Sequence, residues 1–244
     1  KNLLSLLSRN GYLGLGLNEK YGGSGEDLYD LGILFEQLGY HAAPLSLSGC
    51  LVDVAQTMQK FSNERSCKEI LSSIIAGEIY TSAILEPSNQ DPENPMTTAT
   101  IENDQLIISG TKYLSEISSI AKSILISVNS SEGVLLVLVE SDKVKLTELA
   151  STANSPLFKV ELDSVRISKE SIIHEQGRGL EALRYLIQIN MVMRSYFALG
   201  ITEKMTSLVA KYTSEREQFG RVIGTFQAVS HRAADCFIEL ECLR

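Results

Sequence analysis

Apolar residues recur at helical spacing along the first third of the chain. Three stretches show this spacing: residues 30–40, 51–61 and 64–76. In the first stretch Leu31, Leu34 and Leu38 stand three and four residues apart, which places their side chains on one face of a helix. The glycine at position 39 and Pro44 are expected to end this helix. These patterns predict an α-helical N-terminal domain over residues 1–79.

The hydrophobic period changes to two in the middle of the chain. Phe158, Val160 and Leu162 alternate with charged residues, which is the pattern of a half-buried strand. Further short apolar runs predict strands over residues 80–85, 105–112, 123–128 and 133–140. We therefore expect a middle domain over residues 80–176 that is an antiparallel, barrel-like sheet.

Helical spacing returns from residue 177. Leu180, Leu183 and Ile187 begin a stretch that predicts one long helix, or two helices joined near Gly200. A second amphipathic stretch follows Phe226. Two such helices cannot bury their apolar faces alone, so further chain or another subunit must cover them. The predicted fold class is α+β, and residues 177–244 supply only the first helices of a C-terminal helical bundle.

Composition and charge exclude several classes of function. The 244 residues carry a formal charge of −8, which argues against nucleic-acid binding because that function requires a basic face. No run approaches the roughly 20 apolar residues of a membrane span. The four cysteines lack metal-ligand spacing and are typical of reduced thiols, so we expect a cytoplasmic location.

The chain ends and the histidines add smaller expectations. The sequence begins without Met and stops inside a helical pattern, so we expect the intact protein to be longer. The three histidines share no spacing, and no metal site is predicted. We expect His41 and His174 to be surface loop residues and His231 to have a structural role.

Residues 216–235, REQFGRVIGTFQAVSHRAAD, combine cationic, amide and aromatic side chains around a short turn. A plain connector between helices needs only a cap and a few polar residues, so this combination suggests a site for a flat, anionic ligand. The Gly-rich segment GYLGLGLNEKYGGSG lacks the spacing of a dinucleotide or P-loop motif. It predicts a turn with left-handed glycines.

Five segments, in order, resemble the acyl-CoA dehydrogenase family over nearly the whole chain. They are GYLGLGLNEKYGGSG, ILEPSNQDPENPMTTA, LIISGTKYLSEISSIAKSILIS, LFKVELDSVRISKESII with EQGRGLEAL, and YTSEREQFGRVIGTFQAVSHRAAD. The resemblance implies FAD-dependent dehydrogenation of an acyl-CoA thioester to the trans-2-enoyl-CoA. It also implies an electron-transferring flavoprotein as electron acceptor, and assembly as a homodimer, a homotetramer or a heteromer.

The same resemblance assigns cofactor-binding residues at the turn. Arg216 is expected to bind the flavin pyrophosphate, since a guanidinium matches phosphate oxygens better than an ammonium does. Gln218 and Phe219 are expected to line the adenosine half of FAD, and Phe226 and Gln227 to continue that surface. The alternatives are a solvated helix-end charge for Arg216 and core packing for Phe226.

The sequence departs from the family pattern at two places near the expected flavin. The Glu-Pro loop of typical members continues with Gly-x-Gly-Ser-Asp, which contacts flavin and substrate, but the loop after Glu86 has no glycine here. Asp91 matches an Asp-Pro loop of some bacterial members and is the substrate-binding candidate. The family's Trp-Ile-Thr/Ser triplet is also missing. Tyr113, Leu114 and Ser115 stand in its place. Either Tyr113 or Leu114 supplies an apolar wall to the flavin and Ser115 a hydroxyl, or all three are ordinary strand-end residues.

The catalytic residues stay unknown. No acidic residue lies between Glu181 and Glu203 on the first bundle helix, so no carboxylate base is identified. Arg194 on that helix is a candidate for CoA binding or for stabilising the bundle. Two alternative functions remain open: a non-catalytic or flavin-sharing partner subunit of a heteromeric dehydrogenase, and a monooxygenase or oxidase of related fold.

Overall fold

The computed structural model describes residues 2–43, 47–152 and 156–244. The chain divides into two compact units. The first contains Lys1–Leu31 and Ser46–Met191, and the second contains Gly32–Leu45 and Val192–Arg244. The domain boundaries at residues 79/80 and 176/177 follow the change of hydrophobic period and stay a proposal. Each unit is described by itself below.

The N-terminal part is helical, as its sequence pattern predicts. Its helices are α1 (Asn2–Arg9), α2 (Leu28–Tyr40), the π-helix η3 (Gly49–Val54), α3 (Ala55–Phe61) and α4 (Glu64–Ile75). The Gly-rich segment between α1 and α2 has left-handed backbone at Gly11, Gly16, Gly22 and Gly25. The predicted glycine turn is thereby confirmed.

The helix α2 ends at Tyr40, directly after Gly39, as the sequence predicts, and Pro44 lies outside the described residues. A Cβ atom added at Gly39 would lie 2.0 Å from the carbonyl oxygen of Phe197 on α5 (Gly179–Glu215). One added at Gly200 would lie 1.9 Å from the carbonyl oxygen of Glu36. Within the second unit, both glycines therefore permit two helix backbones to approach closely. The helix α5 is continuous through Gly200.

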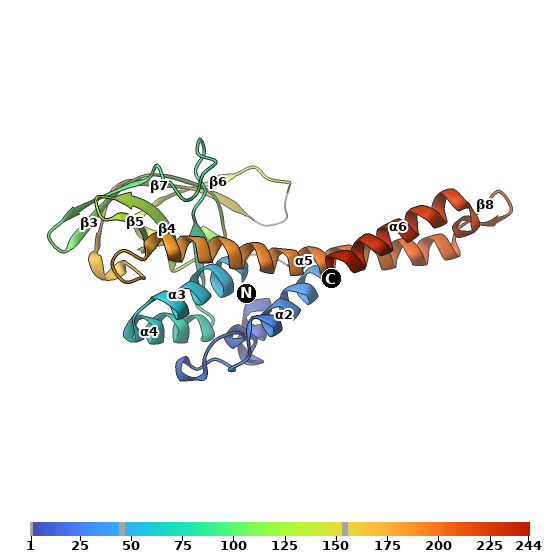
Figure 1. The fold of residues 1–244 in the computed structure, drawn as a ribbon, viewed down its shortest axis with the longest axis horizontal. Helices are drawn as coiled ribbons and strands as arrows, with labels where there is room; N and C mark the ends of the chain where they lie inside the picture. The colour runs from blue at the N-terminus through green and yellow to red at the C-terminus, as the bar shows by residue number, and fades with distance from the viewer. Residues whose placement is uncertain (1, 44–46, 153–155) are drawn as a thin grey trace. The chain divides into compact units, whose positions relative to one another are not determined.

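The middle of the chain forms a sheet in the first unit. Its strands are β1 (Tyr80–Ala83), β2 (Thr98–Glu102), β3 (Gln105–Glu116), β4 (Ser123–Ser130), β5 (Gly133–Glu140), β6 (Lys145–Leu149) and β7 (Leu157–Ser168). Among the described residues these strands make one seven-stranded sheet, and Figure 1 shows that it is curled. Alternate apolar side chains from these strands, among them Leu106, Ile124 and Val160, form one buried cluster. The α+β fold class is confirmed.

The sheet is not purely antiparallel, which corrects one part of the prediction. Strand β1 pairs with β4 in parallel, with Tyr80 opposite Ser123. Parallel neighbours need a long connection, and the loop after β1 together with the β2–β3 hairpin supplies it. The sequence pattern also missed β2 and β6, whose residues are mostly exposed and therefore show no clear apolar alternation.

In the second unit the later half of α5 lies beside α6 (Gln227–Leu243), and a short hairpin joins them (Figure 1). The hairpin consists of β8 (Glu217–Gln218) and β9 (Arg221–Val222). Large apolar side chains on these two helices are exposed, including Met205, Leu208, Tyr212, Phe237 and Ile238. No helix of the described residues is long and apolar enough to cross a lipid bilayer.

His174 is buried, so its expected position on the surface was wrong. Its Nε2 accepts a hydrogen bond from the Leu136 amide at 3.1 Å. Its Nδ1 lies 2.8 Å from the Glu175 carbonyl oxygen and therefore carries the ring proton. Burial lowers the pKa of His174, which keeps the ring neutral. His41 is exposed, and all four cysteines are free.

Candidate functional site

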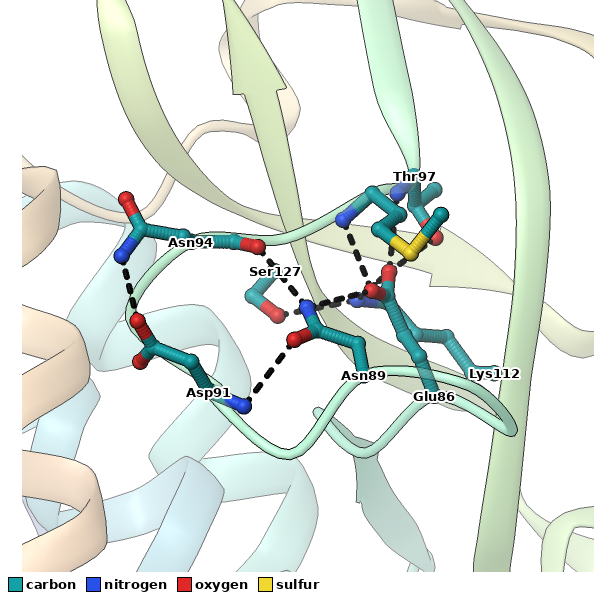
Figure 2. A network of polar contacts seen from close by, with 8 residues as sticks. Glu86, Asn89, Asp91, Asn94, Thr97, Lys112 and Ser127 are labelled. Atoms are coloured by element: carbon teal, nitrogen blue, oxygen red, sulfur yellow. Dashed lines mark hydrogen bonds and ion pairs between the residues drawn. The ribbon is translucent and has the colours of Figure 1, made fainter.

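A loop of the first unit joins β1 to β2, and one buried carboxylate holds both ends of it. Oε1 of Glu86 accepts hydrogen bonds from the Thr97 amide at 2.8 Å and from the Thr97 hydroxyl at 2.6 Å. Oε2 of Glu86 accepts from the Met96 amide at 2.7 Å and from Asn89 Nδ2 at 3.1 Å. Figure 2 shows these contacts converging on Glu86. The first and last residues of the loop are therefore held together.

The same carboxylate is paired with a buried lysine from the sheet. Nζ of Lys112, on β3, lies 2.8 Å from Glu86 Oε1 and 3.1 Å from the hydroxyl of Ser127 on β4. The Lys112 side chain is 0% exposed and the Glu86 side chain is 4% exposed. Such a pair anchors the loop to the sheet because neither charge can separate without remaining buried alone.

The pKa shifts of this pair follow from burial and hydrogen bonding. Burial by itself raises the pKa of Glu86, but the hydrogen bonds from Lys112, Thr97, Met96 and Asn89 outweigh it and lower that pKa to about 2. Burial lowers the pKa of Lys112, and the contact with Glu86 opposes that shift. The carboxylate is therefore ionised at neutral pH.

Side-chain hydrogen bonds replace glycines in shaping the middle of the loop. Asn89 donates to the Asn94 carbonyl oxygen at 2.8 Å and accepts from the Asp91 amide at 2.9 Å. The Asp91 carboxylate accepts from the Glu93 amide at 3.1 Å and from Asn94 Nδ2 at 2.5 Å. Asp91, the substrate-binding candidate, is therefore exposed but already has partners inside its own loop (Figure 2).

A cleft of about 310 Å³ opens beside the two ends of this loop. It is lined by Glu86, Pro87, Ser88, Met96, Thr97, Gly110 and Thr111. Glycine at position 110 is required by close packing, because an added Cβ would lie 2.6 Å from the Thr97 hydroxyl oxygen. The loop thus fits the β3 strand closely at its base.

The end of β3 carries Leu114 and Ser115, which the resemblance sets against the Trp-containing triplet. The pairing of β3 with β7 shifts register between Lys112 and Ser115, which is a β-bulge. Within it Leu114 has φ of +56° and a side chain that is 44% exposed. A left-handed backbone is strained for a leucine, and such strain concentrates at functional sites.

Ser115 points into the protein instead. Its side chain is buried, donates to the Ser82 carbonyl oxygen at 2.7 Å and accepts from the Ser118 hydroxyl at 2.7 Å. The hydroxyl of Ser115 is therefore already hydrogen-bonded within the protein. Its expected flavin contact stays a prediction.

The other cofactor-binding candidates lie in the second unit, at the β8–β9 hairpin. Phe219 and Gly220 form its two-residue turn, with φ of +54° and +79°. Positive φ at both positions is the type I′ pattern, which favours Asn-Gly over a phenylalanine. The Phe219 side chain is 92% exposed. A strained, exposed aromatic at a hairpin tip fits contact with a ligand better than it fits folding of the hairpin.

Cationic and amide groups surround this aromatic tip. Arg216, Gln218 and Gln227 are exposed. The ring of Phe226 lies edge-on to Phe219 with 6.2 Å between centroids. The Arg221 guanidinium stands 4.1 Å over the Phe226 ring. Sequence reasoning did not select Arg221, although its place directly after the turn could have indicated it.

Glu181 and Glu203, the acidic residues on either side of the acid-free stretch of α5, have surface partners. Arg178 contacts Glu181 in a two-pronged geometry at 2.8 and 2.9 Å. Arg244 lies 3.0 Å from Glu203. Arg194, the other substrate-binding candidate, is exposed on α5 in the second unit. Among the described residues no His, Cys, Asp and Glu cluster could hold a metal ion.

Two family models match the chain at its two ends. The model for the N-terminal domain of acyl-CoA dehydrogenases matches residues 1–78, and the model for their C-terminal domain matches residues 177–244. The chain belongs to the acyl-CoA dehydrogenase family. The resemblance seen in the five sequence segments is confirmed.

Named relatives of the family align along nearly all of the chain. Probable acyl-CoA dehydrogenase YngJ of Bacillus subtilis (strain 168) is 23% identical over 249 residues, which cover 96% of this chain and 66% of YngJ. Acyl-CoA dehydrogenase FadE12 of Mycobacterium tuberculosis (strain ATCC 25618 / H37Rv) is 26% identical over 245 residues, which cover 95% of this chain and 63% of FadE12. The chain thus spans just under two thirds of the length of these relatives.

Solved structures share the fold over the same extent. A variant of the Tcur3481-Tcur3483 steroid ACAD is 31% identical with a TM-score of 0.89, covering 99% of this chain and 66% of that one. The ChsE4-ChsE5 complex from Mycobacterium tuberculosis is 24% identical with a TM-score of 0.91, covering 98% of this chain and 65% of that one. The second likeness concerns the fold alone.

Proposed function

We propose that the protein is an FAD-dependent dehydrogenase that converts an acyl-CoA thioester to the trans-2-enoyl-CoA. The observation that carries this proposal is the β8–β9 hairpin, where a strained and exposed Phe219 stands among exposed cationic and amide groups in a chain of this family. The Phe219 ring meets Phe226 edge-on but stays almost fully exposed, and the type I′ turn favours Asn over a phenylalanine at that position. A flat anionic cofactor gives it a role.

The residues of the hairpin fit the two halves of FAD chemically. Arg216 offers a planar guanidinium to a pyrophosphate, and Phe219 offers a ring face for an adenine. Gln218, Phe226 and Gln227 extend this surface, and Leu114 offers an apolar side chain to a flavin ring. When bound, FAD supplies the acceptor for the hydride that leaves the β-carbon of the substrate.

The loop from Glu86 to Thr97 is the part of the chain that we assign to the substrate. Its backbone is held by side-chain contacts at both ends, so it presents a fixed surface beside the cleft. Asp91 and Arg194 are the proposed contacts to the acyl-CoA. The base that removes the α-proton is not assigned to any described residue.

A second candidate function is a partner subunit in a heteromeric dehydrogenase. The glycine-free loop and the replacement of the family's Trp favour it. The name of the Tcur3481-Tcur3483 steroid ACAD, which is 31% identical, joins two proteins. We propose that such a subunit would share a flavin site with its partner. The homodimer and homotetramer remain the forms expected of the self-sufficient enzyme.

The visible absorption spectrum of the purified protein tests the proposal. A flavin band that bleaches on anaerobic addition of one acyl-CoA supports the dehydrogenase. The panel consists of short, medium and long straight-chain acyl-CoA thioesters and a CoA thioester of a steroid side chain. A protein that stays colourless with added FAD, and gains colour only with a co-purified homologue, supports the partner subunit instead.

Electron transfer provides a further test. The dehydrogenase is proposed to pass electrons to an electron-transferring flavoprotein, in the cytoplasm. Substrate-dependent reduction of that flavoprotein supports this proposal. Substrate-dependent consumption of oxygen in the absence of the electron-transferring flavoprotein supports a related oxidase or monooxygenase.

A further inference from the structure

A continuous series of polar contacts runs through the loop from the sheet to α5. Lys112 contacts Glu86, and Glu86 contacts Asn89. Asn89 contacts both Asp91 and Asn94, and these two residues contact each other (Figure 2). The series begins in the buried sheet and reaches the exposed middle of the loop.

The series continues from the loop to α5 through Glu93. Oε2 of Glu93 accepts hydrogen bonds from Arg184 Nε at 3.0 Å and from Arg184 Nη2 at 2.8 Å. The two residues are 91 positions apart in sequence, and both belong to the first unit. Among the polar contacts described for residues 86–97, this pair is the one that reaches a helix.

The two ends of this series differ in burial. Lys112 and Glu86 are almost fully buried, whereas Arg184 and Glu93 are 56% and 37% exposed. Breaking the buried pair is expected to disturb the fold. Breaking the exposed pair removes a weak interaction and is expected to leave the fold intact. The exposed pair can therefore affect the position of the loop without determining whether the protein folds.

The composition of the loop explains why such a contact matters. Residues 86–97 contain three prolines and no glycine, so their backbone is stiff and tends to move as one piece. A stiff loop that is fixed at its base is oriented by any contact farther along it. The Glu93–Arg184 pair provides that contact.

We propose that Glu93 and Arg184 are positioning residues, which fix the loop against α5 and so place the acyl-CoA substrate. Neither residue is assigned a contact with the reacting atoms. The substrate part of this inference rests on the proposed function, whereas the fixing of the loop does not. The pair acts on substrate binding more than on the chemical step.

Charge reversal tests the proposal on the purified full chain. The variants are Glu93→Arg, Arg184→Glu and the double variant that exchanges the two residues. Hydrogen exchange of the amides in residues 88–96 reports loop order, and steady-state kinetics report KM and kcat. The matched control exchanges Arg178, which directly precedes α5, and Glu181 in the first turn of α5, which form another exposed, two-pronged pair.

Each single reversal is expected to speed exchange in the loop and to raise KM by about threefold to fivefold, the scale of an exposed ion pair. The double variant is expected to restore both, and kcat and the control are expected to stay unchanged. Unchanged exchange in the single variants, or no restoration in the double variant, overturns the proposal. Faster exchange in the single variants with an unaltered KM overturns its substrate part. If no acyl-CoA is turned over, the proposed function fails, but the exchange data still decide whether the pair fixes the loop.

Discussion

Nζ of Lys112 lies 2.8 Å from Oε1 of Glu86, and both side chains are withdrawn from solvent. The carboxylate also accepts hydrogen bonds from the two ends of one loop, so it joins a strand of the sheet to a segment that we assign to substrate. A buried charge in this position stabilises the loop only while its partner is present.

Removal of Lys112 alone is expected to destabilise the protein strongly. Lys112→Met leaves the Glu86 carboxylate buried without its cation, which costs about 3 to 5 kcal/mol. The double variant Glu86→Gln with Lys112→Met is expected to lose less than Lys112→Met alone. Urea unfolding measures the free energy of unfolding of the single and the double variant. Lys159→Met, at a half-buried pair on the surface of the sheet, is the control and should change stability by less than about 1 kcal/mol. Equal losses at the two sites would contradict the buried-pair account.

The Glu86 carboxylate should also make stability depend on pH in the acid range. Its pKa is about 2 in the fold and 4.5 without the fold's contacts. The contribution of Glu86 to the free energy of unfolding is therefore complete above the pKa that this residue has in the unfolded chain. It is lost as pH falls from about 5 toward 2. The difference between the wild type and Glu86→Gln in unfolding free energy should shrink by roughly 2 to 3 kcal/mol over that range. If the unfolding free energies of the wild type and of Glu86→Gln fall in parallel with pH, Glu86 is not the group that causes the pH dependence.

Phe219 is expected to strengthen FAD binding although its left-handed backbone conformation destabilises the turn. Phe219→Asn suits the type I′ turn better, so thermal stability should stay equal or rise. Loss of the aromatic face should weaken FAD binding by about tenfold. Titration of apoprotein with FAD and a thermal melt measure the two effects. Tyr29→Asn changes another exposed aromatic and should leave FAD affinity unaltered. Tight FAD binding by Phe219→Asn would remove this residue from the site.

Arg216 is expected to need its guanidinium, not only its charge. Arg216→Lys keeps the positive charge but loses the planar, two-pronged geometry, so FAD affinity should fall by about tenfold. Arg232→Lys, at an exposed arginine on α6, is the matched control. Calorimetric titration with FAD measures the FAD affinity of both variants. Equal affinities for the two variants would support the alternative that Arg216 is a solvated helix-end charge.

The sequence by itself determined the local elements and the family. The change from helical period to alternation and back predicted the α+β fold, because these periods reflect which side chains face the core. The hairpin candidates from Arg216 to Gln227 were also visible, since they are neighbours in sequence. Strands with few buried residues, β2 and β6, gave no such signal.

Only the tertiary structure decided which distant residues meet. Glu86 and Lys112 are 26 positions apart, and Glu93 and Arg184 are 91 apart. A charged residue in sequence looks the same whether it is solvated or paired inside the protein, and only the path of the backbone distinguishes the two. The same reason explains why His174 proved to be buried, and why Gly39 and Gly200 permit two helix backbones to approach closely.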